Sequence, residues 1–182
     1  MKNHLAKLAL ACLLLPALGT AQNAKLDLPD FRTLADKATE SVNISLSPWL
    51  LHTMAAFMDD TDADSAAVKK LLAGIKTIEV RSFSFTTDFA YSAADIDAVR
   101  RQLAAPGWSR LMQVHNRDSN EDVDMYLLIE NDQTHGFALI ASEPREFTII
   151  NIAGSISIED LPKLQNRLHL PKAGMSRLHL MM

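Results

Sequence analysis

Apolar and polar residues follow three different spacings along the chain, and each spacing predicts a different structure. Residues 8–18 form an almost unbroken apolar run. Between residues 28 and 103, apolar residues recur mostly every three or four positions, which indicates helices that bury one side. From residue 108 to residue 153 they recur at every second position, which indicates strands.

The helical spacing predicts five helices. They cover about residues 29–39, 49–58, 66–73, 92–103 and 160–168. The second is apolar on nearly all sides, so we expect it to be buried in the core. Ser47 and Pro48 favour its start, because a serine hydroxyl caps a helix and proline is well tolerated at the first helical position. Ser92, with Asp95 three residues later, predicts a capped start for the fourth helix.

Strand-like alternation predicts an antiparallel sheet. It covers about residues 42–46, 76–85, 108–115, 123–130, 135–141 and 147–153, the first of these being short. The links between the last four segments are short and rich in turn residues, so these strands are antiparallel neighbours. We therefore predict an α+β domain with an antiparallel sheet of about five strands and packed helices.

Two of the predicted strands are apolar on both faces, at residues 126–129 and 147–150. A sheet with one face in water alternates more regularly than this. Either helices cover both faces, or part of one face meets a partner or a ligand. Five helices suffice for the first alternative, which we favour. Under the second, Tyr126, Leu128 and Ile150 are the candidate interaction surface.

The first apolar run predicts a secretory signal peptide. Lys2 and Lys7 give it a basic start, and small residues precede position 22 where a signal peptidase reads them. We expect residues 1–21 to be removed by cleavage between Ala21 and Gln22, which leaves one domain over residues 22–182. The run has about 11 residues, where a membrane-spanning helix needs roughly 20.

Cys12 raises the alternative of a lipoprotein signal. Cleavage in front of Cys12 would cut the apolar run short and leave a strongly apolar mature terminus. We therefore expect ordinary export to the periplasm or the medium, without lipid anchoring through Cys12. No transmembrane span is expected in the mature chain.

Composition narrows the class of protein further. The mature chain would contain no cysteine, so the hydrophobic core must stabilise the fold without disulfides. Cysteine ligands, nucleophiles and redox pairs are excluded for the same reason. The formal charge of the whole chain is −4 and becomes −6 when Lys2 and Lys7 are removed. Such a charge argues against a nucleic-acid binder and against a polybasic membrane anchor.

Several segments together resemble a known family. They are residues 71–81 (LLAGIKTIEVR), Gly107 with Trp108, residues 123–126 (VDMY), residues 147–156 (FTIINIAGSI) and Leu161. In this order, over about residues 42–165, they resemble domain of unknown function 4252, an uncharacterised exported bacterial family. The resemblance implies an exported single domain and carries over no activity and no catalytic residue.

Two acidic clusters are interpreted as structural. Asp60, Asp62 and Asp64 match the opening of a calcium loop, but Ser65 stands where such a loop needs glycine, and Leu71 where it needs glutamate. We expect Asp62 or Asp64 to cap the next helix, near its positive end. The acidic residues between 118 and 124 are expected to form a solvated hairpin turn.

Two further groups of side chains are candidates for binding or chemistry. His115 and His135 lie on neighbouring strand regions and form the candidate polar site, for a zinc ion or an acid/base pair; surface histidines at strand ends are the simpler interpretation. Met54 and Met58 lie one helical turn apart beside Trp49 and Phe57 and offer a surface for apolar ligands, although we expect them to pack in the core.

The function predicted from the sequence is a non-enzymatic binding or interaction domain of the cell envelope. The partner is an unknown envelope protein or an apolar ligand, and a homodimer is left open. No cofactor, metal or catalytic residue is expected. The alternative is a cryptic metal-assisted or acid/base enzyme that uses the strand histidines and nearby carboxylates. A stress-related envelope factor that acts on regulators is a third hypothesis, which no residue discriminates.

Overall fold

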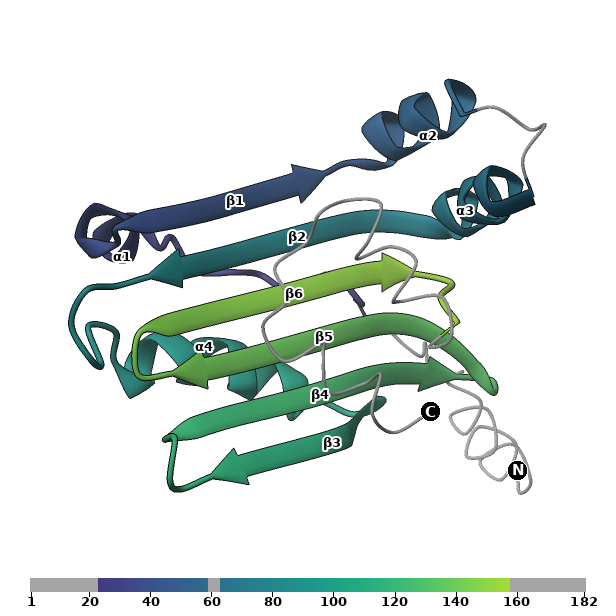
Figure 1. The fold of residues 1–182 in the computed structure, drawn as a ribbon. Coiled ribbons are helices and arrows are strands. Elements are labelled where there is room, and N and C mark those ends of the chain that lie inside the picture. The colour runs from purple at the N-terminus through teal and green to yellow at the C-terminus, as the bar shows by residue number, and fades with distance from the viewer. Residues whose placement is uncertain (1–22, 59–62, 158–182) are drawn as a thin grey trace, which may run out of the picture.

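A six-stranded antiparallel sheet forms the centre of the molecule (Figure 1). The computed structural model describes residues 23–58 and 63–157. The strands are β1 (Glu40–Leu46), β2 (Ile75–Ser84), β3 (Trp108–Asn116), β4 (Glu121–Glu130), β5 (Gln133–Glu143) and β6 (Glu146–Gly154). Their order across the sheet is β1-β2-β6-β5-β4-β3. The predicted α+β class is confirmed, and the short first segment pairs over its whole length with β2, which gives six strands instead of about five.

Four helices accompany the sheet. They are α1 (Arg32–Lys37), α2 (Pro48–Ala56), α3 (Ala63–Gly74) and α4 (Ala93–Leu103). The first is shorter than predicted, because no side chain caps its start at Phe31 and the residues before it run along the sheet. The predicted helix at 160–168 lies outside the described residues. Within the described ranges, no helix is both long and apolar enough to cross a membrane.

The predicted start of α4 is confirmed in atomic detail. The Asp95 carboxylate accepts hydrogen bonds from the backbone N–H and the hydroxyl of Ser92, at 2.8 Å each. The pair satisfies a backbone donor that the helix itself leaves free. The buried stripe of this helix consists of Ile96, Val99 and Leu103, as the spacing predicts.

Both faces of the inner strands of the sheet are buried, whereas the edge strands β1 and β3 are partly exposed. One face, called here the α2/α3 face, packs with Leu51, Ala55, Val68, Leu71 and Leu72 of those two helices. The opposite face, called the α4 face, packs with the buried stripe of α4 and with Leu26, Phe31 and Leu34. This arrangement explains why the central strands are apolar on both sides.

The candidate interaction surface predicted from the sequence is therefore corrected. Tyr126 is 6% exposed, and Leu128 and Ile150 are fully buried. Tyr126 belongs to the core of the α4 face and Ile150 to the core of the α2/α3 face. The apolar pattern of these strands reports two-sided core packing and not a surface for a partner.

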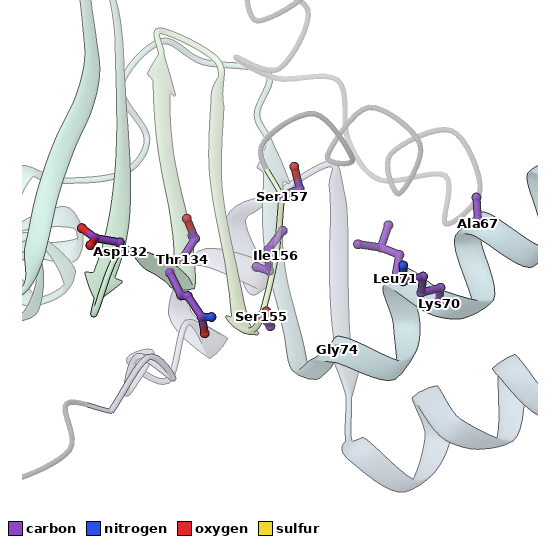
Figure 2. A pocket seen from close by; sticks show the side chains of 10 residues that line it. Ala67, Lys70, Leu71, Gly74, Asp132, Thr134, Ser155, Ile156 and Ser157 are labelled. Atoms are coloured by element: carbon purple, nitrogen blue, oxygen red, sulfur yellow. The ribbon is translucent and has the colours of Figure 1, made fainter.

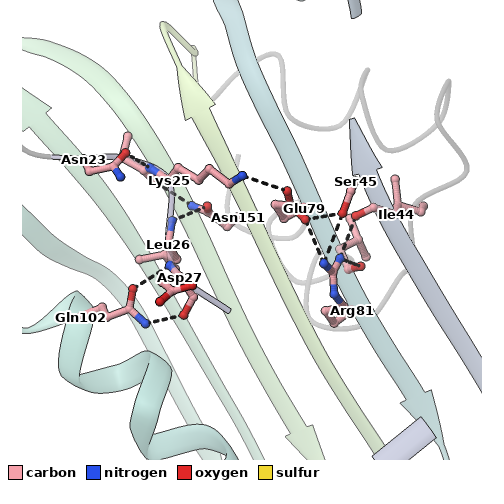
Figure 3. Close-up of polar contacts among 12 residues, drawn as sticks. Asn23, Lys25, Leu26, Asp27, Ile44, Ser45, Glu79, Arg81, Gln102 and Asn151 are labelled. Carbon is pink, nitrogen blue, oxygen red and sulfur yellow. Dashed lines mark hydrogen bonds and ion pairs between the residues drawn. The ribbon is translucent and has the colours of Figure 1, made fainter. Parts of the chain in front are cut away.

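A buried asparagine ties the N-terminal segment to the sheet (Figure 3). Asn151 in β6 has no exposed surface, and its amide makes three hydrogen bonds. Its Oδ1 accepts from the backbone N–H of Leu26 at 2.9 Å, and its Nδ2 donates to the carbonyls of Ala24 and Phe137 at 3.0 and 3.1 Å. A backbone segment that begins at Ala24 is thus part of the packed domain.

Gln102 of α4 holds the next turn of the same segment. Its Nε2 donates to the carbonyl of Asp27 at 2.7 Å, and its Oε1 accepts from the Asp27 N–H at 2.8 Å. The segment is therefore fixed from the sheet and from the helix at once, and it completes the cover of the α4 face.

We predict that Asn151→Ala lowers the free energy of unfolding by about 2–3 kcal/mol, because it removes the hydrogen bonds of the buried amide to the Leu26 N–H and to the carbonyls of Ala24 and Phe137. Urea denaturation of the mature domain measures this loss. Asn43→Ala on β1 is the matched control, since Asn43 is exposed and its replacement should change stability by less than about 0.5 kcal/mol. Equal stability of the two variants would contradict the assigned role of Asn151.

Candidate functional site

Two aromatic side chains of α2 lie in solvent. Trp49 is 74% exposed and Phe57, at the end of the helix, is 86% exposed. The expectation that this helix is buried is wrong, because only Leu51 and Ala55 reach the core. The physical reason is its position: α2 lies at a corner of the sheet and, among the described elements, packs mainly against α3 and β2 (Figure 1). We call Trp49 and Phe57 the α2 aromatic face.

The two aromatic residues lie on the same side of α2. They are eight residues apart, which is about 12 Å along the axis and within about a quarter turn around it. No aspartate, glutamate, lysine or arginine occurs between Ser47 and Met58. The Thr53 hydroxyl donates to the carbonyl of Trp49 at 2.8 Å, so this polar group is satisfied within the helix. The outer side of α2 therefore carries Trp49, Phe57 and the exposed imidazole of His52, and no carboxylate, lysine or arginine.

The neighbouring methionines contribute less to this surface. Met58 is partly buried and packs against the core of the α2/α3 face, and Met54 is half-buried. The expectation that these methionines pack in the core is therefore confirmed for Met58.

Other exposed apolar side chains in the described residues are scattered. Phe89 lies in a loop, Leu111 in a bulge of the edge strand β3 and Ile129 near the end of β4. Single exposed apolar residues are common on soluble proteins and need no function. Among the described residues, α2 alone carries two large exposed apolar side chains.

The candidate polar site of His115 and His135 is not assembled. His115 pairs with Asp122 across the β3–β4 register, whereas His135 follows Thr134, which pairs with Ile129. About seven residues of β4 separate these positions, which is more than about 20 Å at roughly 3.3 Å per residue. Among residues 23–58 and 63–157, no three His, Cys, Asp or Glu side chains are grouped so that they could hold a metal ion.

His115 has a local partner instead. Its Nδ1 lies 2.7 Å from Oδ1 of Asp122, and both side chains are substantially exposed. The pair sits beside the β3–β4 turn on an open edge of the sheet. It joins two neighbouring strands, and an exposed pair of this kind contributes little to stability.

The acidic turn between β3 and β4 is not solvated throughout. Asp124 is 2% exposed, and its carboxylate meets Arg100 of α4 at 3.0 Å and Arg110 of β3 at 3.7 Å. Arg110 also lies over the ring of Tyr126 and donates to its hydroxyl, and this hydrogen bond raises the pKa of the guanidinium. Asp124 therefore anchors α4 to the sheet and is not part of a surface patch.

A second charged cluster joins the N-terminal segment to the opposite edge of the sheet (Figure 3). Glu79 is 8% exposed and contacts Lys25 at 3.5 Å and Arg81 at 3.0 Å. The Ser45 hydroxyl donates to the same carboxylate at 2.5 Å, and Arg81 donates to the carbonyl of Ile44 at 2.9 Å. These charges are neutralised inside the domain, and they connect β1, β2 and the N-terminal segment.

Two hollows lie at the end of the sheet where β2 begins and β6 ends. The larger, of about 760 Å³, lies between α3 and the β4–β5 turn, with Lys70 and Asp132 on its walls (Figure 2). The smaller, of about 440 Å³, is lined in part by Lys76, Glu130 and His135. Each hollow is lined by side chains of both charges, so His135 has charged neighbours.

The Tyr91 hydroxyl has a shifted pKa because its ring is packed in the α4 face. Burial raises the pKa of Tyr91 to about 12. Its hydroxyl donates to the carbonyl of Glu143 at 2.5 Å, and its ring stacks on Phe147 with the centroids 5.1 Å apart. The neutral phenol is therefore part of the packing of the α4 face.

This shift predicts a loss of stability at high pH. The hydroxyl ionises near pH 10 in the unfolded chain but only near pH 12 in the folded chain. Its contribution is therefore complete below pH 10 and falls as the pH rises from 10 to 12. Urea denaturation across this range should show a steeper decline for the wild type than for Tyr91→Phe. Parallel declines would show that Tyr91 is not responsible.

Comparison with known proteins identifies a family. The model of the family described as "Domain of unknown function (DUF4252)" matches residues 35–164, which confirms the resemblance found in the sequence. No curated protein matches the chain. No solved structure matches it either.

Proposed function

The chain belongs to the family of domain of unknown function 4252, and we propose that it is an exported, non-enzymatic domain that binds its partner through the α2 aromatic face. The exposure of Trp49 and Phe57 on an uncharged helix carries the proposal. Side chains of this size each remove about 150–250 Å² from water when they are buried, which is favourable. A contact that covers both rings would therefore be stable without any change in the core.

The positions of the polar side chains support binding over catalysis. The carboxylates of Glu79 and Asp124 form ion pairs with arginine side chains. The Asn151 amide makes its hydrogen bonds with backbone groups. His115 and His135 are held far apart by the strand register. Each of the two carboxylates and the amide is committed to holding elements of the fold together.

The packing of the N-terminal segment is compatible with the predicted cleavage between Ala21 and Gln22. This segment packs into the domain from Ala24 onward. A mature chain that begins at Gln22 would keep every contact described above. Processing and folding are thus compatible.

Export can be tested with the chain expressed with its own leader in a Gram-negative host. Mass spectrometry of the periplasmic protein should show an unmodified chain that begins at Gln22, and Ala21→Asp should block processing because it places a charge where a small residue is required. Cys12→Ala is the control, and it should leave processing and mass pattern unchanged. An acylated species that begins at Cys12 would show a lipoprotein instead.

Binding can be tested by sedimentation with envelope membranes of the source cells. We expect the double variant Trp49→Ser/Phe57→Ser to lose at least about tenfold in association, because two large apolar side chains no longer contribute. Leu111→Ser/Ile129→Ser is the matched control, since it also removes two exposed apolar side chains, and it should bind like the wild type. Equal binding of all three proteins would refute the assignment of the α2 aromatic face.

A further inference from the structure

The smaller of the two hollows is built from four separate parts of the chain. The N-terminal segment, the start of β2, the neighbouring ends of β4 and β5, and the end of β6 all contribute to its lining. Its volume of about 440 Å³ is typical of pockets that hold small molecules, which measure about 300–1,000 Å³. Neither Trp49 nor Phe57 lines it, so it is separate from the α2 aromatic face.

Two β-bulges bring their extra residues to this hollow. In the pairing of β2 with β6, the register shifts at the start of β2 and leaves Lys76 without an opposite residue. In the pairing of β4 with β5, the register shifts near the turn and leaves His135 without one. Both extra residues line the smaller hollow. Bulges are frequent next to active sites, because the extra residue redirects a side chain away from the regular alternation.

Gly154 makes the bulge at Lys76 possible. Its φ angle is +137°, a conformation that favours glycine. A Cβ at this position would lie 2.7 Å from the backbone nitrogen of Lys76 and 2.5 Å from the carbonyl oxygen of Gly74. Both are backbone atoms, which cannot move aside as the end of a side chain can. The position of Lys76 at the hollow therefore depends on β6 as well as on β2.

A buried hydroxyl lies next to the bulged lysine. Thr77 lines the hollow, and its Oγ1 is buried and has no hydrogen-bond partner among the described residues. The one other buried side-chain atom of this kind in the described ranges, Oδ1 of Asp124, lies 3.7 Å from the charged group of Arg110. Nearly all buried polar atoms in folded proteins are paired. The Thr77 hydroxyl is therefore available for a hydrogen bond with a group bound in the hollow.

The charged side chains around the hollow favour an anion. Lys25, Lys76 and Glu130 line it. Lys25 also meets Glu79 at 3.5 Å, but Glu79 pairs with Arg81 as well, so these five side chains carry three positive and two negative charges (Figure 3). Lys76 is exposed and forms no ion pair with any of the described residues. The local excess of positive charge contrasts with the net charge of −4 of the whole chain.

We propose that the smaller hollow binds a small molecule through an oxyanion, that is, a carboxylate or phosphate group. The Lys76 ammonium supplies the charge, and the imidazole N–H of His135 and the Thr77 hydroxyl supply further donors. Oxyanions accept hydrogen bonds from all three kinds of group, and a bond between two charged groups is shorter and stronger than a neutral one. This site goes beyond the proposed function and does not depend on it.

Titration of the ¹⁵N-labelled mature chain, residues 22–182, tests the site. We expect sodium phosphate or sodium acetate at constant pH to shift the backbone amide signals of Lys76, Thr77 and His135 until they saturate. Sodium chloride at the same ionic strength should leave these signals in place. Tighter binding of phosphate would assign a phosphate ligand, and tighter binding of acetate a carboxylate. Shifts that never saturate, or equal shifts with chloride, would overturn the proposal.

Two substitutions give the quantitative test with the tighter of the two anions. Lys76→Gln should weaken its binding about tenfold, because a charge-assisted hydrogen bond is lost. Thr77→Val keeps the shape of the side chain without its hydroxyl and should weaken binding about threefold. Lys70→Gln is the matched control, since it removes an exposed lysine of the larger hollow, and it should bind like the wild type.

Urea denaturation separates a ligand group from a structural one. Thr77→Val should be at least as stable as the wild type without anion, because the hydroxyl makes no hydrogen bond within the described fold. A loss of stability would show that the fold uses this hydroxyl, and unchanged affinity of Lys76→Gln would refute the site. The variant Trp49→Ser/Phe57→Ser should keep the affinity for the anion, so the failure of either proposal is distinguishable from the failure of the other.

Discussion

The burial of β6 on both faces is the constraint on which the arrangement of the molecule depends. Residues 147–154 are all buried, and the strand lies between β2 and β5 in the interior of the sheet. A strand with apolar residues on both sides is stable only if both faces of the sheet are covered. The helices and the N-terminal segment must therefore be divided between two layers.

This division accounts for the position of α2. The α4 face is completed by α4, α1 and the segment that Asn151 and Gln102 hold, whereas α2 and α3 pack on the other face. Because α2 follows the edge strand β1, it meets the sheet mainly at β2, and the side chains of Trp49 and Phe57 stay in solvent. The proposed binding role rests on this exposure.

Local sequence patterns predicted the helices and strands, whereas pairing between distant segments determines their neighbours and their burial. The alternation and the turn residues were sufficient for the four consecutive strands, and Ser92 with Asp95 was sufficient for the start of α4. The pairing of β2 with β6 and the contact of Asn151 with Leu26 join distant segments, on which periodicity gives no information. The separation of His115 and His135 follows from the strand register, which periodicity does not give either. The exposure of α2 was missed for a related reason. Apolar spacing shows which side chains are apolar, but not which other elements pack against them.

The topology also gives the proposed contact a direction. β1 ends and β2 begins at the same end of the sheet, so α2 and α3 lie there, and Asn23 lies at that end as well, beside Lys76 and Gly154. Asn23 and α2 therefore lie at the same end of the sheet. A partner that covers Trp49 and Phe57 would leave the opposite end of the sheet, with the β3–β4 and β5–β6 turns, facing solvent.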